Sequence, residues 1–191
     1  MQQEFNYDVI SGVDLNGNPK NILVDSGGSV SFSPGLAYES TATIARAANT
    51  TAYTANDVYG TVFELANIGL SGGFVFLNSL DIIFNITALP LGMGVFAVYL
   101  FNATPPSAIT DNLPYSLGSG DRETIITLNG ISLIASLARG GGSVVAESLN
   151  INQLFKLATG STSLWGYLTT AAFTPAANSE TATIRARSFA P

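Results

Sequence analysis

The chain has 191 residues, of which 47% are hydrophobic, and a formal net charge of −6 from 7 basic and 13 acidic side chains. It contains no histidine and no cysteine, which excludes a Ser–His–Asp triad, a Cys–His dyad and a zinc site with nitrogen or sulfur ligands. Charged residues make up 10% of the chain, against about 25% in an ordinary soluble domain. So few charges favour a surface that other chains cover, although a merely neutral soluble domain has the same composition.

Residues 1–37 are predicted to form an extended N-terminal arm. The segments VDLNGNPKN (13–21) and DSGGSVSFSPG (25–35) are rich in turn-forming residues, and ILV (22–24) between them is a short β-type patch. An extended arm needs a neighbouring surface to hold it. That surface can belong either to another subunit or to the chain's own domain.

Residues 38–191 show the period-2 pattern of β-strands. In TATIRAR (181–187) the Ala and Ile side chains point to one face, and the Thr and Arg side chains point to the other, solvated face. NSLDIIFNIT (78–87) follows the same rule apart from Ile83, with Asp81 predicted to point outward. GVFAVYLFN (94–102) is apolar on both faces, which is typical of a central or covered strand. Further strands are predicted at residues 61–66, 123–128, 148–158 and 163–173.

The predicted fold class is all-β, a jelly-roll-like two-sheet sandwich of about eight to ten short antiparallel strands. Turn-forming residues separate the strands at fairly even spacing. The segment NGISLIASLARGGG (129–142) fits a short helix that ends at Arg139, while its β-branched residues keep a strand open. TATIARA (41–47) is nearly repeated by TATIRARS (181–188), which predicts that the first and last strands of the domain lie side by side.

Few side chains could carry chemistry. Asp121 and Glu123 flank Arg122, which is typical of charge balance at a solvated turn and not of the acid pair of a glycosidase. DLNGN at Asp14 lacks the glycine and glutamate positions of a calcium loop, and RGGGS (139–143) lacks the Gly-Lys-Ser/Thr of a phosphate loop. We therefore expect no catalytic residue, no metal site and no cofactor.

Nucleic acid and membrane are not expected as partners. Nucleic-acid binding needs several cations on one face, whereas the basic residues here are scattered along the chain. The N-terminal sequence MQQEFNYDVISG is polar and acidic and does not fit a signal peptide. No stretch reaches the roughly 18 continuous apolar residues of a membrane helix.

Three stretches resemble small β-rich virion structural proteins of tailed bacteriophages, namely ARAANTTAYTANDVYG (45–60), NATPPSAITDNLPY (102–115) and LFKLATGSTSLWGYLTTAAFTPAANSETATIRA (154–186). The resemblance spans most of residues 45–186, and the arm before Leu36 lies outside it. Its motifs are not active-site motifs and transfer no catalytic residue.

The resemblance implies a capsid decoration or cement protein, a jelly roll that binds the lattice of the major capsid protein on the virion surface as trimers. The arm is expected to bridge to neighbouring subunits through Phe5, Tyr7, Val9, Ile10, Ile22 and Val24. Interface roles are also expected for Tyr53, Tyr59, Trp165 and Tyr167.

Two other functions are alternatives to capsid decoration. The alternative is a tail-fibre or receptor-binding β module that recognises a host surface glycan. Trp165 and Tyr167 share one strand face and could form a carbohydrate platform, but the core or a subunit interface is the more typical place for such rings. A glycan-cleaving enzyme is disfavoured because no plausible acid pair is present.

Overall fold

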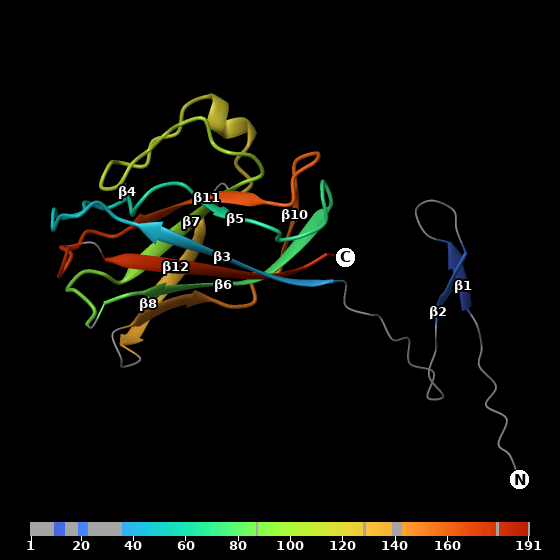
Figure 1. Ribbon diagram of the computed structural model, residues 1–191, viewed down its shortest axis with the longest axis horizontal. Coiled ribbons are helices and arrows are strands. Elements are labelled where there is room, and N and C mark those ends of the chain that lie inside the picture. Colours follow the sequence, from blue (N-terminus) through green and yellow to red (C-terminus); the bar gives the residue numbers. More distant parts are fainter. Residues whose placement is uncertain are drawn as a thin grey trace, which may run out of the picture. The chain divides into compact units, whose positions relative to one another are not determined.

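The computed structural model describes residues 10–13, 19–22 and 36–190 apart from residues 87, 128, 139–142 and 179, and it describes no side chains in the first two ranges or at residues 135–138. The chain divides into two units, Met1–Pro34 and Gly35–Pro191. In the first unit, strands β1 (Ile10–Val13) and β2 (Pro19–Ile22) pair antiparallel, with Ile10 opposite Ile22 (Figure 1). The sequence had not predicted this pairing.

The second unit contains ten strands in its described residues, and all of their pairings are antiparallel. One short 3₁₀ helix, Gly120–Glu123, is the only helical segment of the described chain. The all-β fold class is therefore confirmed. The strands are β3 (Ala37–Ala45), β4 (Asp57–Val58), β5 (Phe63–Leu65), β6 (Phe74–Phe84), β7 (Val95–Phe101), β8 (Ile131–Ala138), β9 (Val144–Ser148), β10 (Gln153–Lys156), β11 (Leu164–Thr170) and β12 (Thr181–Phe189).

The strands pair in the nested order of a jelly roll. The first strand, β3, pairs with the last, β12; β4 and β5 pair with β11; β6 pairs with β9; and β7 pairs with β8. This order gives one sheet β3-β12-β6-β9 and a second sheet β8-β7-β11-β4, joined where β9 also pairs with β8 (Figure 1). Two sheets built from such nested pairs form a jelly-roll sandwich. The short β10 lies outside the order and pairs with the start of β6.

The predicted pairing of the first and last strands is confirmed along its whole length. The register runs from Ala37 opposite Phe189 to Ala45 opposite Thr181. Both strands bury one face, because Ile44 and Ile184 point into the core while the Thr side chains of β3 face outward and are exposed. The similar sequences thus reflect similar positions at neighbouring places in one sheet.

The core lies between the two sheets and is filled by alternate side chains of the long strands. Leu80, Ile82 and Phe84 of β6 are fully buried, as the sequence predicted. On the outer face of β7 and β11 a second cluster contains Val58, Phe101 and Tyr167, packed against residues of the 102–127 loop. This cover explains why β7 is apolar on both faces.

Side-chain hydrogen bonds from β3 and β12 reach the chain that follows β5 and so link the two sheets. Ser40 Oγ donates to the carbonyl of Ala66 at 2.6 Å, and Ser188 Oγ donates to the carbonyl of Ile68 at 2.7 Å. Gly60 has a φ of +81°, and a Cβ there would lie 2.3 Å from Ile44 Cγ2. A glycine is therefore required both by the backbone and by the close approach to β3.

Three predicted elements are resolved or corrected. Residues 129–142 contain strand β8, because buried Ile131 and Leu133 alternate with exposed neighbours. The described part of the predicted strand at 123–128, residues 123–127, forms no strand, since backbone bonds to the Asp121 carbonyl turn the chain there and only one isolated bridge follows among these residues. The predicted strand at 148–158 is interrupted, because Asn150 and Asn152 have positive φ angles of 57° and 52°, which a regular strand does not tolerate.

Candidate interaction surface

The arm residues predicted to bridge subunits fall mostly outside the described chain. Phe5, Tyr7, Val9 and Val24 lie outside the described residues. Ile10 and Ile22 are opposite each other in the β1–β2 pair. A bridging role for these six residues stays a prediction.

The four rings predicted at an interface are placed mainly in the interior. Tyr53, Tyr59 and Tyr167 are at most 2% exposed, so these rings cannot contact another subunit directly, and packing within the chain accounts for them. Trp165 is half-buried beside the second cluster, and its interface role stays a prediction. Because Tyr167 is covered, it cannot form an exposed ring platform with Trp165.

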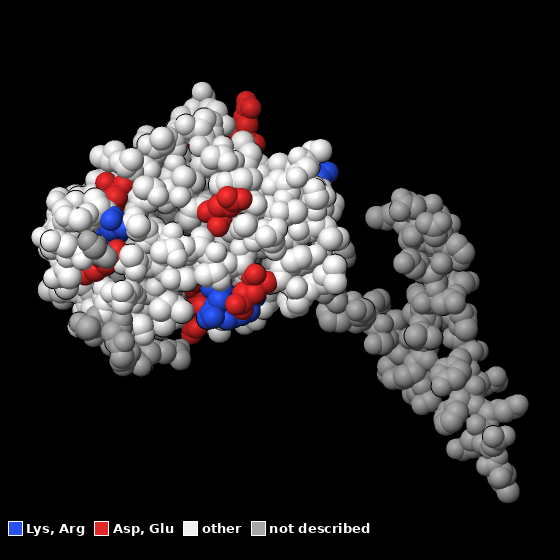
Figure 2. Space-filling view, viewed as in Figure 1, with Lys and Arg blue, Asp and Glu red and all other residues white. Residues whose placement is uncertain are grey.

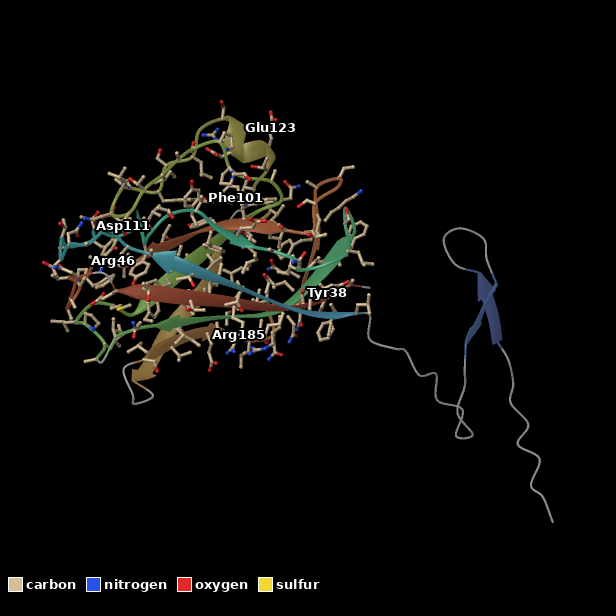
Figure 3. The ribbon with its side chains drawn as sticks, viewed as in Figure 1. Tyr38, Arg46, Phe101, Asp111, Glu123 and Arg185 are labelled. Carbon is tan, nitrogen blue, oxygen red and sulfur yellow. The ribbon has the colours of Figure 1, made fainter. Side chains whose placement is uncertain are left out.

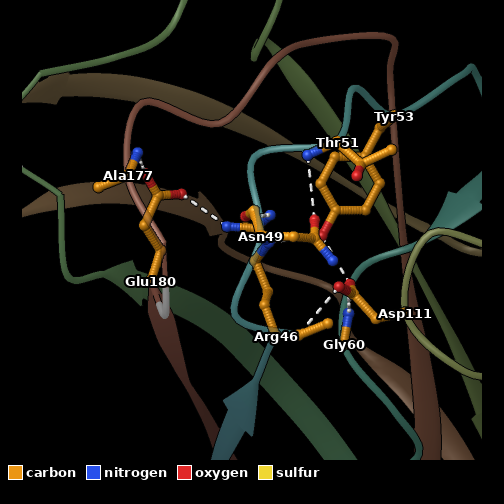
Figure 4. A network of polar contacts seen from close by, with 9 residues as sticks. Arg46, Asn49, Thr51, Tyr53, Gly60, Asp111, Ala177 and Glu180 are labelled. Carbon is orange, nitrogen blue, oxygen red and sulfur yellow. Dashed lines mark hydrogen bonds and ion pairs between the residues drawn. The ribbon is translucent and has the colours of Figure 1, made fainter.

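A buried arginine organises one end of the sandwich (Figure 4). Arg46 follows β3, and its Nη1 lies 3.2 Å from Glu180 Oε2. Its Nε donates to Tyr53 Oη at 2.6 Å, and its Nη2 donates to the carbonyl of Asn49 at 3.2 Å. The guanidinium carbon lies 5.3 Å from the ring centroid of Tyr53 and 5.6 Å from that of Tyr59, within the range of cation–π attraction.

Asp111 ties the 102–127 loop to the same place. Tyr53 Oη donates to Asp111 Oδ1 at 2.6 Å, the Gly60 N–H donates to that oxygen at 2.7 Å, and the Ala47 N–H donates to Oδ2 at 3.0 Å. Burial raises the pKa of Tyr53, and its hydrogen bond to Asp111 raises it further, so this hydroxyl stays protonated at neutral pH. Arg46, Tyr53, Asp111 and Glu180 are called the end network below.

The end network is not predicted from the sequence, although one signal for it is present. Ala45 lies opposite Thr181 in the β3–β12 register, and Arg46 and Glu180 are the residues just beyond that pair. The predicted pairing of the two similar segments would therefore have placed a basic and an acidic side chain next to each other.

A second charged group lies on the outer face of β3, β12 and β6. Asp81 Oδ2 accepts from Nε and Nη2 of Arg185 at 3.0 and 2.6 Å, and Asp81 Oδ1 accepts from Arg187 Nη1 at 3.0 Å. Arg187 Nε also donates to Glu39 Oε2 at 3.1 Å. Hydrogen bonding to Asp81 raises the pKa of Arg185. These four residues are called the outer-face cluster.

The outer-face cluster is partly open to solvent. The side chains of Arg185 and Arg187 are 33% and 40% exposed, whereas Asp81 is 6% exposed beneath them. The predicted outward direction of Asp81 is confirmed, but the two arginines cover it. Arg185 points away from the sandwich interior in Figure 3, and Figure 2 shows that charged side chains gather in a few small groups on the visible face.

Asp121, the first member of the acidic pair Asp121 and Glu123, has a structural role. Asp121 is buried and accepts hydrogen bonds from the N–H of Ser107 at 3.0 Å, the N–H of Gly118 at 2.8 Å and the Ser107 hydroxyl. Burial raises the pKa of Asp121, but these hydrogen bonds outweigh it and hold the pKa below the usual value. Asp121 is thus an ionised acceptor that shapes its loop, while Glu123 is exposed.

Metal sites and membrane-spanning helices are two further features that the described residues could contain. Within that part of the chain, no three His, Cys, Asp or Glu side chains gather closely enough to hold a metal ion. The same residues contain no helix with the length and apolar character needed to cross a membrane.

Comparison with known proteins gives little beyond the strand order. No protein-family model matches the sequence, and no curated protein matches it. The capsid asymmetric unit of cyanophage Pam1 is similar in structure with a TM-score of 0.36 and 12% identity, over 85% of this chain and 91% of that chain. Desmodium yellow mottle tymovirus gives a TM-score of 0.29 and 13% identity over the same shares, 85% and 91%. Both TM-scores are low, and the jelly-roll fold is therefore assigned from the nested strand order alone.

Proposed function

We propose that this chain is a virion structural protein that binds the lattice of the major capsid protein as a decoration or cement protein, in trimers. The observation that carries the proposal is the nested strand order, because viral capsid domains are among the proteins built on the jelly roll. The resemblance of three long stretches to phage virion proteins supports the same role.

The composition of the surface fits a protein that acts by contact. Large apolar side chains such as Leu91, Ile134 and Leu154 are 98%, 66% and 56% exposed. The chain has few charged side chains, so its surface is weakly hydrated. A cement protein contacts several capsid subunits at once, so contacts that are modest individually add through multivalency. The sequence of the arm includes several apolar residues between Phe5 and Val24, and its β1–β2 pair has strand edges that suit strand addition to a neighbour.

Binding to shells that lack the protein tests the proposal. The full chain, mixed with such shells, is expected to co-sediment with them and to saturate a fixed number of sites. Because no histidine is present, binding is expected to be flat between about pH 6 and 8. A chain that stays in the supernatant contradicts the proposal, and binding to host glycan in its place favours the tail-fibre alternative.

Removal of residues 1–35 tests the bridging role of the arm separately. The described core residues all lie between Ile44 and Ala190, so the shortened chain is expected to keep its β-sheet circular dichroism spectrum. It is expected to lose occupancy on shells. Unchanged occupancy would contradict the role of the arm and leave the role of the sandwich standing.

A further inference from the structure

A row of apolar side chains crosses the outer face of four neighbouring strands. The registers place Ala37 of β3 opposite Phe189 of β12, Phe189 opposite Phe76 of β6, and Phe76 opposite Leu154 of β10. Phe76 and Phe189 are less buried than the residues on either side of them, which are buried, and Ala37 and Leu154 are exposed. Phe74 lies beside Phe76 on the same face and is 48% exposed. These five residues are called the apolar patch.

A contiguous group of exposed apolar side chains such as the apolar patch calls for an explanation, whereas a single exposed apolar side chain does not. Scattered apolar residues are normal on a soluble protein, whereas contiguous ones mark a contact surface. Phe74 and Leu154 on adjacent strands are about half exposed, at 48% and 56%. A hollow of about 270 Å³ adjoins the patch between β3 and β12, lined in part by Ala37, Glu39 and Phe189.

Opposite charges lie at opposite corners of the apolar patch. Glu39 is two residues beyond Ala37 on the outer face of β3, opposite Arg187, and its side chain is 53% exposed. Lys156 is two residues beyond Leu154 on β10, opposite Phe74, and its Nζ lies 5.6 Å from the Phe74 ring centroid. Because β3 and β10 run in opposite directions, Glu39 and Lys156 lie on opposite sides of the row of apolar side chains. With strand spacings of ~4.8 Å and rises of ~3.4 Å per residue, their Cα atoms are about 20 Å apart.

We propose that the apolar patch is the contact surface for a second copy of this chain, packed face to face. The two-fold axis lies in the plane of the interface, perpendicular to the line from Glu39 to Lys156. Rotation about this axis places Glu39 of each copy over Lys156 of the other and brings the phenylalanine rings together. The surface is therefore self-complementary, as a two-fold interface requires.

The size of the apolar patch predicts a reversible contact. The rectangle that has Glu39 and Lys156 at opposite corners measures about 14 Å on each side and encloses roughly 200 Å², of which the apolar patch is a part. Even this area is well below the roughly 800 Å² per partner of a standard stable interface. Glu39 already pairs with Arg187, but an exposed pair of this kind contributes little and leaves the carboxylate free to meet a second cation. The contact does not depend on the proposed function; on a shell it would link neighbouring copies or neighbouring trimers.

Charge exchange between two variants tests the proposed geometry. Sedimentation equilibrium at low salt is run on the full-length wild type, on Glu39→Lys, on Lys156→Glu and on their equimolar mixture. The weight-average mass of the wild type is expected to rise with protein concentration. Each variant alone places like charges at both corners and is expected to associate at least about tenfold more weakly. In the mixture, each mixed pair again has opposite charges at both corners, so association is expected to return.

A matched pair of leucine variants tests the apolar part. Leu154→Ser removes a side chain of the patch and is expected to weaken association, whereas Leu91→Ser removes a leucine that is 98% exposed in the turn before β7 and is expected to have no effect. Circular dichroism and thermal unfolding of each variant show that the fold is kept. The proposal is overturned if the wild-type mass does not change with concentration, or if the charge variants associate as strongly as the wild type. It is also overturned if the mixture associates no more strongly than each charge variant alone, or if the two serine variants have equal effects. None of these measurements uses a shell, so the result is independent of the proposed role in the virion.

Discussion

The end network and the outer-face cluster use the same chemistry in opposite surroundings. In the end network, the paired side chains of Arg46 and Glu180 are 0% and 3% exposed. In the outer-face cluster, those of Arg187 and Glu39 are 40% and 53% exposed. A buried charge has lost its water and destabilises the fold unless every partner is in place, whereas an exposed pair remains hydrated and contributes little. In a chain with so few charges, burial separates those that hold the fold from those that are open to other molecules.

Loss of the buried cation should have the largest effect. Arg46→Met keeps the length of the side chain but leaves the Glu180 carboxylate buried without its cation, so we expect the free energy of unfolding to fall by about 3–5 kcal/mol. Urea denaturation followed by circular dichroism measures the change. A loss below 1 kcal/mol would show that Glu180 finds water in the folded state and that the end network is not structural.

Loss of a single hydroxyl should have an intermediate effect. Tyr53→Phe keeps the ring stacked on Phe173, with centroids 4.9 Å apart, but removes the partner of Arg46 Nε and Asp111 Oδ1. We expect the free energy of unfolding to fall by about 1–3 kcal/mol. Tyr38→Phe on half-buried β3 is the control and should be neutral; equal stability of the two variants would contradict the role given to Tyr53.

High pH should destabilise the fold through two buried tyrosines, Tyr53 of the end network and Tyr59, whose ring stacks on it. Burial raises the pKa of Tyr53 and Tyr59 above the usual 10.0. Above pH 10 the tyrosines of the unfolded chain lose their protons while those of the folded chain keep them, which favours unfolding. The contribution of each tyrosine to the free energy of unfolding is therefore complete below pH 10 and falls by about 1.4 kcal/mol at pH 11. Unfolding measured from pH 8 to 11 tests this, and Tyr53→Phe should make the slope shallower. Burial also raises the pKa of Tyr115 and Tyr167, so a flat profile would mean that all four of these hydroxyls ionise in the folded chain.

Loss of an outer-face charge should have the smallest effect. Arg187→Gln removes the exposed pair with Glu39 and one hydrogen bond to Asp81, while Arg185 continues to hold Asp81 with two hydrogen bonds. We expect a change of at most about 1 kcal/mol in the free energy of unfolding. Urea denaturation at low and high salt measures it. A loss as large as that of Arg46→Met would remove the distinction between the two regions.

The sequence predicts best where one strand's pattern is enough. Alternation identified the buried face of β6, and the near-repeat at residues 41–47 and 181–188 identified the β3–β12 pair. The break at Asn150 and Asn152 was missed because asparagine tolerates positive φ without requiring it. The pattern of residues 123–128 suggested a strand, but hydrogen bonds to the Asp121 carbonyl fixed a turn instead.

The candidate surfaces were harder to predict because they depend on registers between distant strands. The apolar patch combines Phe74 with Leu154, and the end network joins Arg46 to Glu180 across 134 positions. Neither combination follows from composition or local periodicity. Tyr53, Tyr59 and Tyr167 were expected at an interface because large rings serve interfaces and cores alike, and only the packing distinguishes the two.

The proposed role is tested most directly by a reconstruction of the virus particle to which the proposal assigns this protein. The jelly-roll domain is expected as density on the outer surface of the shell, with each copy touching more than one major capsid subunit and the N-terminal arm reaching a neighbour. Density confined to the tail, or a particle without this chain, would contradict a role in capsid decoration.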